Sequence, residues 1–438
     1  MDGYTVTAGS LDNALSEARE LYIARNPASQ GALTRAQAVM PGGNTRSALF
    51  YSPFPLAIAR GEGCSLWDAD GHRYLDLLGE FTAGLYGHSD PVIREAIVAA
   101  LDGGLNLGGH NLLEAELARL VCDRFASIER VRFTNSGTEA NLLNLMAAIH
   151  FTGRSRILVF HGGYHGGVLT FAHGPSPANV PHDFVYGTYN DVEGTRALIE
   201  THAGHLAAVL VEPMLGAGGC IPADPAFLTA IREATAASGA LMILDEVMTS
   251  RSSGGGLQAL LGVTPDLTSL GKYIGGGMSF GAFGGRADVM AQFDPALPGA
   301  LPHAGTFNNN VMTMSAGIAG LTQLFPPAAA DALRVRGDML RDHLNGLCHQ
   351  TGVAMQVTGV GSVMNVHFVA GPIRTAADAA RSDSRLRDLF FFDMAEAGIY
   401  LARRGLIALM LPIGEAEIDQ VVDAVGRFVA RRRAFLDA

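Results

Sequence analysis

The chain has 438 residues, of which 48% are hydrophobic and 17% charged, and its formal net charge is −11. This balance fills a sizeable core and argues against disorder and against nucleic-acid binding. No run reaches the ~18 apolar residues of a membrane-spanning helix, the acidic N-terminus has no apolar signal segment, and the four cysteines are too far apart for a zinc site or a disulfide framework. We therefore expect a cytoplasmic enzyme without nucleic-acid or membrane partners.

Along the chain, the first predicted element is a helix over residues 11–25, where apolar side chains recur on one helical stripe. Proline, glycine and asparagine then predict a loop over 41–55. Short strands are predicted within 56–77, around an Asp-Ala-Asp-Gly-His turn. The N-terminal region is thus expected to contain a helix, a loop and a small meander.

From about residue 90 the pattern changes to helices that alternate with short apolar strands. These strands are bounded by glycine, proline or charge, which is typical of strands buried on both faces in a parallel sheet covered by helices. The sequence therefore predicts an α/β fold. The predicted helices span 91–104, 111–125 and 136–153, and the predicted strands span 130–135, 156–160, 207–213 and 240–247.

A break is predicted at 324–333, where two prolines interrupt a helix. It marks the return to a smaller C-terminal domain, which ends in a helix with an apolar face from Ile418 to Val429. We expect an N-terminal segment 1–85 that belongs to a small domain, a large domain 86–328, and a C-terminal part of the small domain at 329–438.

Lys272 is the only lysine, and all other residues of the 31 lysines and arginines are arginine. Arginine replaces lysine in almost any surface role, but it cannot lose its proton and attack a carbonyl carbon, whereas a desolvated lysine can. Lys272 is therefore a candidate nucleophile that forms a Schiff base. The alternative is an arginine-rich chain that keeps one lysine by chance.

Asp245 ends an apolar strand and is followed by Glu246, as in a nucleoside triphosphatase. That interpretation fails, because the only lysine is followed by tyrosine and no phosphate loop precedes it. Pairing Asp245 with Lys272 fits pyridoxal 5′-phosphate, whose aldehyde is held by a lysine and whose ring nitrogen needs an acidic partner. A helix-capping aspartate is the alternative for Asp245.

A phosphate site is predicted at Ser136, Gly137 and Thr138, where a strand runs into a helix. Backbone N–H groups and the positive end of the helix dipole hold phosphate there. The alternative is an ordinary N-cap followed by Glu139 in the first turn. Thr306, in the polar loop HAGTFNNN, is a second group able to reach a phosphate.

Tyr164 lies in the glycine-rich segment FHGGYHGG and is able to stack on a cofactor ring. His161 and His165 flank it, but no carboxylate or cysteine joins them at the spacing of metal ligands, so no metal is expected.

These stretches together resemble the class III pyridoxal-phosphate aminotransferases of fold type I. NSGTEAN, GGYHG, VEP, ILDEV and TSLGKYIGGG occur in that family's order and spacing, and the resemblance covers nearly the whole chain. It implies a large domain with a mostly parallel sheet flanked by helices, a smaller α+β domain from both termini, and a homodimer with shared active sites.

The resemblance also implies roles for individual residues. Lys272 forms the Schiff base, Asp245 pairs with the pyridine nitrogen, and Tyr164 completes the catalytic set. Thr306 reaches the phosphate of the neighbouring subunit's cofactor. The implied cofactor-binding residues are Ser136, Gly137, Thr138, Tyr164, Glu212, Asp245, Val247, Lys272 and Thr306.

Within the family, LWDADGHRYLDL is similar to glutamate-1-semialdehyde aminomutases. MPGGNTRSALFYSPFP, TGVGSVMNVHF and Arg404-Gly405 are closer to aromatic β-amino acid aminotransferases of the β-phenylalanine type. This implies that Arg46 holds the carboxylate of the β-amino acid and Arg404 that of the acceptor, with Glu80 and Phe81 also at the substrate. Because LARRGL doubles the arginine, Arg403 stays an alternative to Arg404.

We therefore expect an aminotransferase that moves the amino group of an aromatic β-amino acid to an oxo acid such as 2-oxoglutarate or pyruvate. One alternative is an aminomutase, which returns the amine to the same molecule. The other is a pyridoxal-phosphate-binding regulator, which needs a DNA-binding module that this acidic chain does not display.

Overall fold

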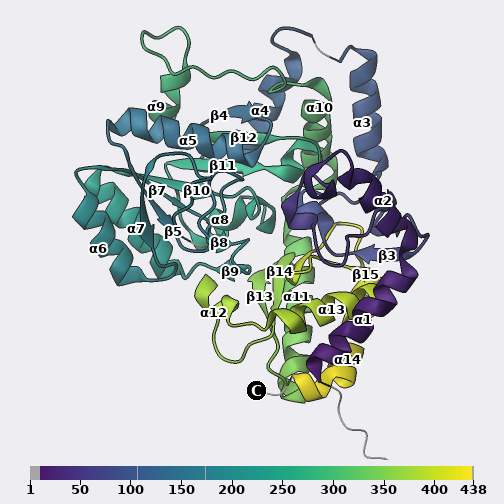
Figure 1. Ribbon diagram of the computed structural model, residues 1–438. Helices are drawn as coiled ribbons and strands as arrows, with labels where there is room; N and C mark the ends of the chain where they lie inside the picture. The colour runs from purple at the N-terminus through teal and green to yellow at the C-terminus, as the bar shows by residue number, and fades with distance from the viewer. Residues whose placement is uncertain (1–9, 106, 173, 437–438) are drawn as a thin grey trace, which may run out of the picture.

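The computed structural model describes residues 10–105, 107–172 and 174–436. Its centre is a seven-stranded sheet in which β12 runs antiparallel to both neighbours and the other strands are mutually parallel (Figure 1). The predicted α/β fold with a mostly parallel sheet is thus confirmed. In spatial order the strands are β4 (Arg130–Thr134), β12 (Gly281–Gly285), β11 (Leu267–Gly271), β10 (Leu241–Asp245), β7 (Leu206–Val211), β5 (Arg156–Phe160) and β6 (Asp183–Gly187).

Helices cover both faces of this sheet. The helix α5 (Gly137–Thr152) packs on β11 and β12, and α7 (Pro225–Ser238) packs on β7 and β10, with α6 (Val192–His202) beside it. Adjacent residues of β10 enter opposite cores: Ile243 lies with the residues of α5, and Leu244 with those of α7. Burial on both faces explains why these strands read as continuous apolar runs.

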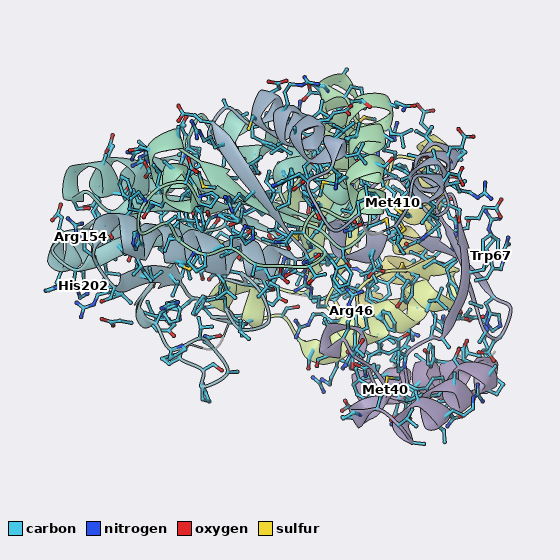
Figure 2. The ribbon with its side chains drawn as sticks, turned by 90° about the horizontal axis from the view of Figure 1, so that it is seen from above. Met40, Arg46, Trp67, Arg154, His202 and Met410 are labelled. Atoms are coloured by element: carbon cyan, nitrogen blue, oxygen red, sulfur yellow. The ribbon has the colours of Figure 1, made fainter. Side chains whose placement is uncertain are left out.

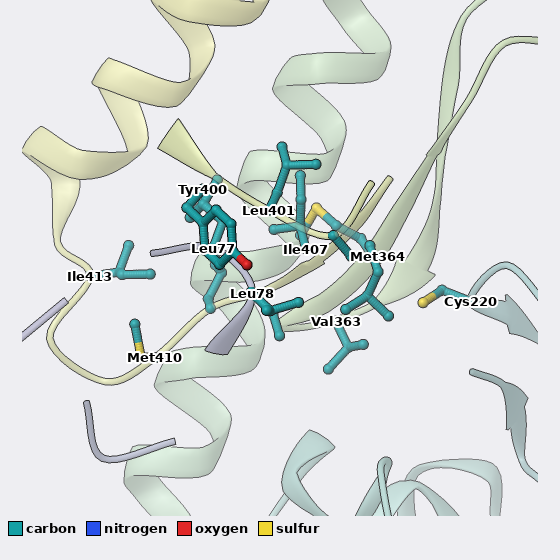
Figure 3. Close-up of a cluster of buried hydrophobic side chains, with 14 of the residues drawn as sticks. Leu77, Leu78, Cys220, Val363, Met364, Tyr400, Leu401, Ile407, Met410 and Ile413 are labelled. Carbon is teal, nitrogen blue, oxygen red and sulfur yellow. The ribbon is translucent and has the colours of Figure 1, made fainter. Parts of the chain in front are cut away.

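The two ends of the chain fold together (Figure 1). The predicted meander is present as β1 (Ile58–Glu62), β2 (Ser65–Asp68) and β3 (Arg73–Asp76), and β15 (Ile399–Tyr400) adds to β3 in parallel. The predicted N-terminal helix is α1 (Leu11–Arg25), which packs on α13 (Ser384–Glu396). Figure 3 shows Leu77 and Leu78 in one apolar cluster with Tyr400 and Ile407.

A second small sheet consists of β13 (Gln356–Val360), β14 (Val363–His367) and β16 (Leu406–Ala408). The helix α11 (Pro327–Thr351) packs on β13, and α14 (Glu415–Arg432) packs on α11. Part of the segment predicted to break a helix, 324–333, does so: the π-helical turn at Gly320–Leu324 continues α10 (Val311–Ala319), the helix stops at Phe325 and Pro326, and residues 327–333 already belong to α11.

The shorter elements connect these layers. The apolar pattern of the sequence does not indicate the helix α2, since Ser29 is its buried residue.

Among the described residues, none of the helices combines the length and the apolar character that a membrane span requires. The remaining elements are α2 (Pro27–Gln37), α3 (Pro91–Asp102), α4 (Leu112–Arg124), β8 (Met214–Leu215), β9 (Ile221–Pro222), α8 (Gly256–Leu261), α9 (Ala287–Met290) and α12 (Ala376–Ala380).

Candidate active site

The candidate site lies at the edge of the large sheet where β4, β10 and β11 end. Asp245, the last residue of β10, is in register with Ser269 on the parallel strand β11, and Lys272 follows β11 directly. Ser136 follows β4 and caps α5. The sheet thus brings residues more than a hundred positions apart to the edge where open α/β folds bind ligands.

Asp245 is a buried carboxylate held by three donors. Its Oδ2 accepts from Asn141 Nδ2 at 2.8 Å and lies 2.8 Å from His165 Nδ1, and its Oδ1 accepts from the Val247 backbone N–H at 3.0 Å. The chain continues into a turn rather than an α-helix, which removes the helix-cap interpretation. The carboxylate is therefore oriented by two side chains and one backbone N–H.

Lys272 begins a short 3-10 turn with a left-handed backbone, φ 58°. Its Nζ donates to the backbone carbonyl of Phe81 at 2.5 Å. Burial of the amine lowers its pKa to about 8, and although Asp245 opposes this shift, Arg404 adds to it. A desolvated amine of this kind is a nucleophile near neutral pH.

A cradle of small residues surrounds the start of α5. A Cβ on Gly137 would lie 2.7 Å from a methyl carbon of Val247, and a Cβ on Gly166 would lie 2.3 Å from Thr138 Oγ1. Only glycine allows this close approach. The first N–H groups of α5 have no partner within the helix, so they and the Thr138 hydroxyl fit a phosphate.

The loop that carries Tyr164 is held by hydrogen bonds to the side chain of Glu212. Glu212 accepts from the backbone N–H groups of Tyr164 at 3.0 Å and Gly216 at 2.9 Å. Burial raises the pKa of this carboxyl to about 7, although the nearby His165 opposes the shift. The side chain of Tyr164 stays half exposed, at 49%.

Thr306 is exposed in the loop between Met290 and α10. Asn308 of the same loop accepts from Asn135 Nδ2 at 2.9 Å, which tethers the loop beside Ser136. This contact fixes Asn308, two residues after Thr306, and among the described contacts none joins Thr306 itself to the cradle of the same chain.

Two arginines lie against the ring of Phe81. The guanidinium carbon of Arg46 is 5.5 Å from the ring centre and that of Arg404 is 5.7 Å. Arg46 forms an ion pair with Glu80. Figure 2 shows Arg46 near the middle of the molecule, with Arg154 and His202 on one side of it and Trp67 on the other.

Arg403 and Arg404, which the sequence left as alternatives, point to different partners. Arg403 forms two hydrogen bonds with Asp388, at 2.5 and 2.7 Å. Arg404 donates to the backbone carbonyl of Ala217 at 3.2 Å and contacts Phe81. The arginine at the candidate site is therefore Arg404.

Sequence reasoning missed several residues of the site. From the sequence, His165 is considered only as a metal ligand, a role that the spacing rejects, yet its Nδ1 lies 2.8 Å from Asp245 Oδ2. In the described part of the chain no cluster of His, Cys, Asp and Glu is able to hold a metal ion. Asn141 lies at the end of NSGTEAN and is bound by Ser269 Oγ at 2.6 Å. Arg251 is fully buried and donates to the carbonyls of Thr82 and Leu409. Its position six residues after Asp245 carries no sequence signal for that contact.

A family model described as aminotransferase class-III matches residues 47–429. A β-phenylalanine transaminase of Variovorax paradoxus is 59% identical over 431 residues, which are 98% of this chain and 99% of the relative. The solved structure of a β-phenylalanine aminotransferase from the same organism has a TM-score of 0.97 at 59% identity, covering 98% of this chain and 99% of its own.

More distant relatives match as well. A glutamate-1-semialdehyde 2,1-aminomutase of Sorangium cellulosum is 39% identical over 395 residues, 86% of this chain and 90% of the relative. The solved structure of a transaminase with PLP bound has a TM-score of 0.87 at 33% identity and covers 94% of this chain and 99% of its own.

Proposed function

The chain belongs to the class-III aminotransferases, and we propose that it moves the amino group of an aromatic β-amino acid to an oxo acid such as 2-oxoglutarate or pyruvate. The observation that carries this substrate class is the pair of arginines, Arg46 and Arg404, against the ring of Phe81. The 59% identity to a β-phenylalanine transaminase over nearly the whole chain supports it.

The residues at the sheet edge fit pyridoxal 5′-phosphate, the cofactor of this reaction. They supply a lysine amine whose pKa is lowered to about 8, a helix start for the phosphate, and a buried carboxylate for the ring nitrogen. When bound, the cofactor supplies an electron sink for the negative charge at the substrate carbon that loses a proton.

Each residue then has a distinct task. Lys272 would hold the cofactor covalently until the substrate amine displaces it, and its freed amine would then move the proton at the reacting carbon of the substrate. Asp245 would hold a proton at the ring nitrogen, and His165 and Asn141 keep its carboxylate in place. The remaining binding residues in this proposal are Ser136, Gly137 and Thr138 at the phosphate, Tyr164 and Val247 on the two faces of the ring, and Glu212 beneath the Tyr164 loop.

Two arginines are needed because the two substrates present their carboxylates differently. The carboxylate of a β-amino acid lies one carbon further from the carbon that bears its amine than the α-carboxylate of 2-oxoglutarate lies from its keto carbon. Both of these reacting carbons must nevertheless reach the same place. We assign Arg46 to the first carboxylate, which replaces Glu80 on the guanidinium, and Arg404 to the second. Phe81 offers an apolar face to the aryl group.

We further propose a homodimer in which Thr306 reaches the phosphate of the neighbouring subunit's cofactor. Three leucines near the start of α4 support an interface, because Leu105, Leu107 and Leu112 are 45%, 55% and 93% exposed. Residues 86–328 would form the large domain and 1–85 with 329–438 the small one, a division that the pairing of β3 with β15 supports. A cytoplasmic location stays a prediction.

The test measures the two half-reactions separately by single-turnover absorbance. Arg46→Ala should impair the β-amino acid half-reaction and Arg404→Ala the oxo-acid half-reaction. A charge-assisted contact contributes ~1.5–3 kcal/mol, so each specificity constant should fall roughly tenfold or more. Equal damage to both halves by either variant would refute the assignment, and isomerisation of glutamate-1-semialdehyde without any acceptor would favour an aminomutase.

A further inference from the structure

Arg404 has few partners at its guanidinium. Its Nη1 donates to Ala217 O at 3.2 Å, and its buried Nε has no hydrogen-bond partner in the part of the chain that the structure describes. Burial lowers the pKa of this guanidinium. Since no acidic side chain of the described residues pairs with it, neutral groups must determine where this charge points until a ligand carboxylate arrives.

The backbone of Arg404 is held by the small sheet. Asn365 Nδ2 on β14 donates to Arg404 O at 3.3 Å, and Val366 N donates to Gly405 O at 2.9 Å. Gly405 has a left-handed backbone, φ 96°, and a Cβ there would lie 2.6 Å from Val366 O. The turn that carries Arg404 is therefore built directly on β14.

The same sheet also binds the turn whose backbone carbonyl, at Ala217, accepts from the guanidinium of Arg404. Ala217 lies in the turn between β8 and β9, and two residues later Gly219 O accepts from Thr358 Oγ1 at 2.7 Å and lies 3.0 Å from His367 Nε2. A Cβ on Gly219 would lie 2.8 Å from His367 Cε1, so the turn rests against this ring. Burial lowers the pKa of His367 to about 4, so the ring is neutral. Its Nε2 carries the proton and donates, because the Gly219 carbonyl is able only to accept.

We propose that Thr358, Asn365 and His367 are positioning residues that set Arg404 for the carboxylate of the oxo acid. All three lie in TGVGSVMNVHF, and they connect the backbone of Arg404 with the turn that contacts its guanidinium. Among the described contacts, none joins these three side chains to Arg46. Their loss should therefore weaken binding of the oxo acid and leave binding of the β-amino acid unchanged. The inference rests on the role proposed above for Arg404.

The experiment uses the holoenzyme of Asn365→Ala, His367→Leu and Thr358→Val in both half-reactions. The Kd for 2-oxoglutarate should rise roughly tenfold, the size expected when a charge-assisted contact is lost, with the β-amino acid half-reaction unchanged. His367→Gln and Thr358→Ser keep a donor and should restore wild-type affinity. Calorimetric binding of 2-oxoglutarate to the Lys272→Ala protein, with and without His367→Leu, measures the same loss without turnover.

Asn345→Ala is the matched control. Asn345 bonds both backbone groups of Val357 on β13, at 3.0 and 2.8 Å, so its loss disturbs the same sheet while the side chains of the three positioning residues stay in place. It should lower stability without changing acceptor affinity. In an Arg404→Ala background, His367→Leu should add no further loss of acceptor affinity.

Three results would overturn the inference: equal damage to both half-reactions, an Asn345→Ala variant that matches the other three, or full additivity with Arg404→Ala. Thr358→Val removes a single hydroxyl, so it decides the matter if the larger changes prevent folding. If Arg404→Ala itself spares the oxo-acid half-reaction, the proposed role of Arg404 is wrong. If it impairs that half-reaction while Thr358→Val does not, the positioning role alone is wrong.

Discussion

Lys272 owes its chemistry to its surroundings. Burial is the main reason that its pKa falls to about 8, and Arg404 and Arg251 lower the pKa further, while Asp245 raises it. The hydrogen bond to Phe81 O directs the amine toward Phe81, whose ring both Arg46 and Arg404 contact. An ordinary lysine, with a pKa of ~10.4, would be almost fully protonated at neutral pH.

We predict that capture of added pyridoxal 5′-phosphate by the apo-protein depends on this pKa. The free amine is the nucleophile, so the capture rate should rise about tenfold per pH unit up to about 8 and then level off. Stopped-flow absorbance between pH 6 and 9.5 measures it. Lys272→Arg should show no covalent capture at any pH, and a wild-type midpoint near ~10.4 would contradict the prediction.

Glu212 gives a second pH-dependent prediction, this time of stability. Its pKa is about 7 in the folded protein and ~4.3 in the unfolded chain, so the folded state binds more protons between these values. Its contribution to stability is therefore complete below the unfolded pKa and is lost as pH rises to about 7.

Glu212→Gln removes this titration. Relative to the variant, the wild type should lose up to ~3 kcal/mol of unfolding free energy between pH 5 and 7, with a constant difference above pH 7.5. Urea unfolding of both apo-proteins across this range measures the difference. Parallel curves for the two proteins would show that Glu212 does not titrate in this window.

At the scale of elements, α11 determines where the hairpin of β13 and β14 sits. Gly337 lies against the turn of this hairpin, where a Cβ would be 2.1 Å from Gly361 O. The neighbouring Asp338 accepts from the Gly361 backbone N–H at 2.9 Å. The absence of a side chain at Gly337 thus allows the helix to approach the strands that carry Asn365 and His367.

Two glycines of α11 make a matched pair for a stability prediction. Gly337→Ala should lower the free energy of unfolding by ~1–3 kcal/mol, because the new methyl group displaces backbone. At Gly346 a Cβ would meet no atom within 4 Å, so Gly346→Ala should raise the free energy of unfolding by up to ~1 kcal/mol through helix propensity. Denaturant unfolding midpoints of the two variants measure these changes in stability. If both variants were destabilised, the tight contact proposed for Gly337 alone would be contradicted.

At the scale of the whole molecule, the site lies where the large sheet meets the part formed by both chain ends. Lys272 comes from the large sheet, Phe81 from the N-terminal segment and Arg404 from the C-terminal one. Arg251 joins the same parts, since it donates to Thr82 O and Leu409 O. The geometry of the candidate site therefore depends on how these parts are held together.

The proposed dimer gives the last prediction. Leu107→Asp and Leu112→Asp place charge on the exposed leucines near α4, where burial of a charge at an interface would cost several kcal/mol. Light scattering should find the wild type as a dimer and the double variant as a monomer with weakened cofactor binding. Met339→Asp, at an exposed apolar side chain of α11, is the control and should leave the mass unchanged. A double variant with the mass of the wild type would exclude this surface.

The sequence by itself determined the fold class and predicted the centre of the candidate site. Three local features carried these predictions: the continuous apolar strands, the helix that follows Ser136 and the single lysine after β11. Local features are predictable because burial and capping leave a periodic or compositional signal in the sequence. The confirmed positions of the large sheet, the meander and the break before α11 all depend on such signals.

Only the tertiary structure decided which of the paired arginines faces Phe81, what orients Asp245, and how β14 holds Arg404. Asp388 forms hydrogen bonds with Arg403. His165 contacts Asp245, 80 positions away in the sequence, and Asn365 binds Arg404, 39 positions away. These are contacts between single polar groups from separate elements. They leave no periodic pattern in the chain, because a hydrogen bond depends on where two atoms meet after packing and not on the residues beside them.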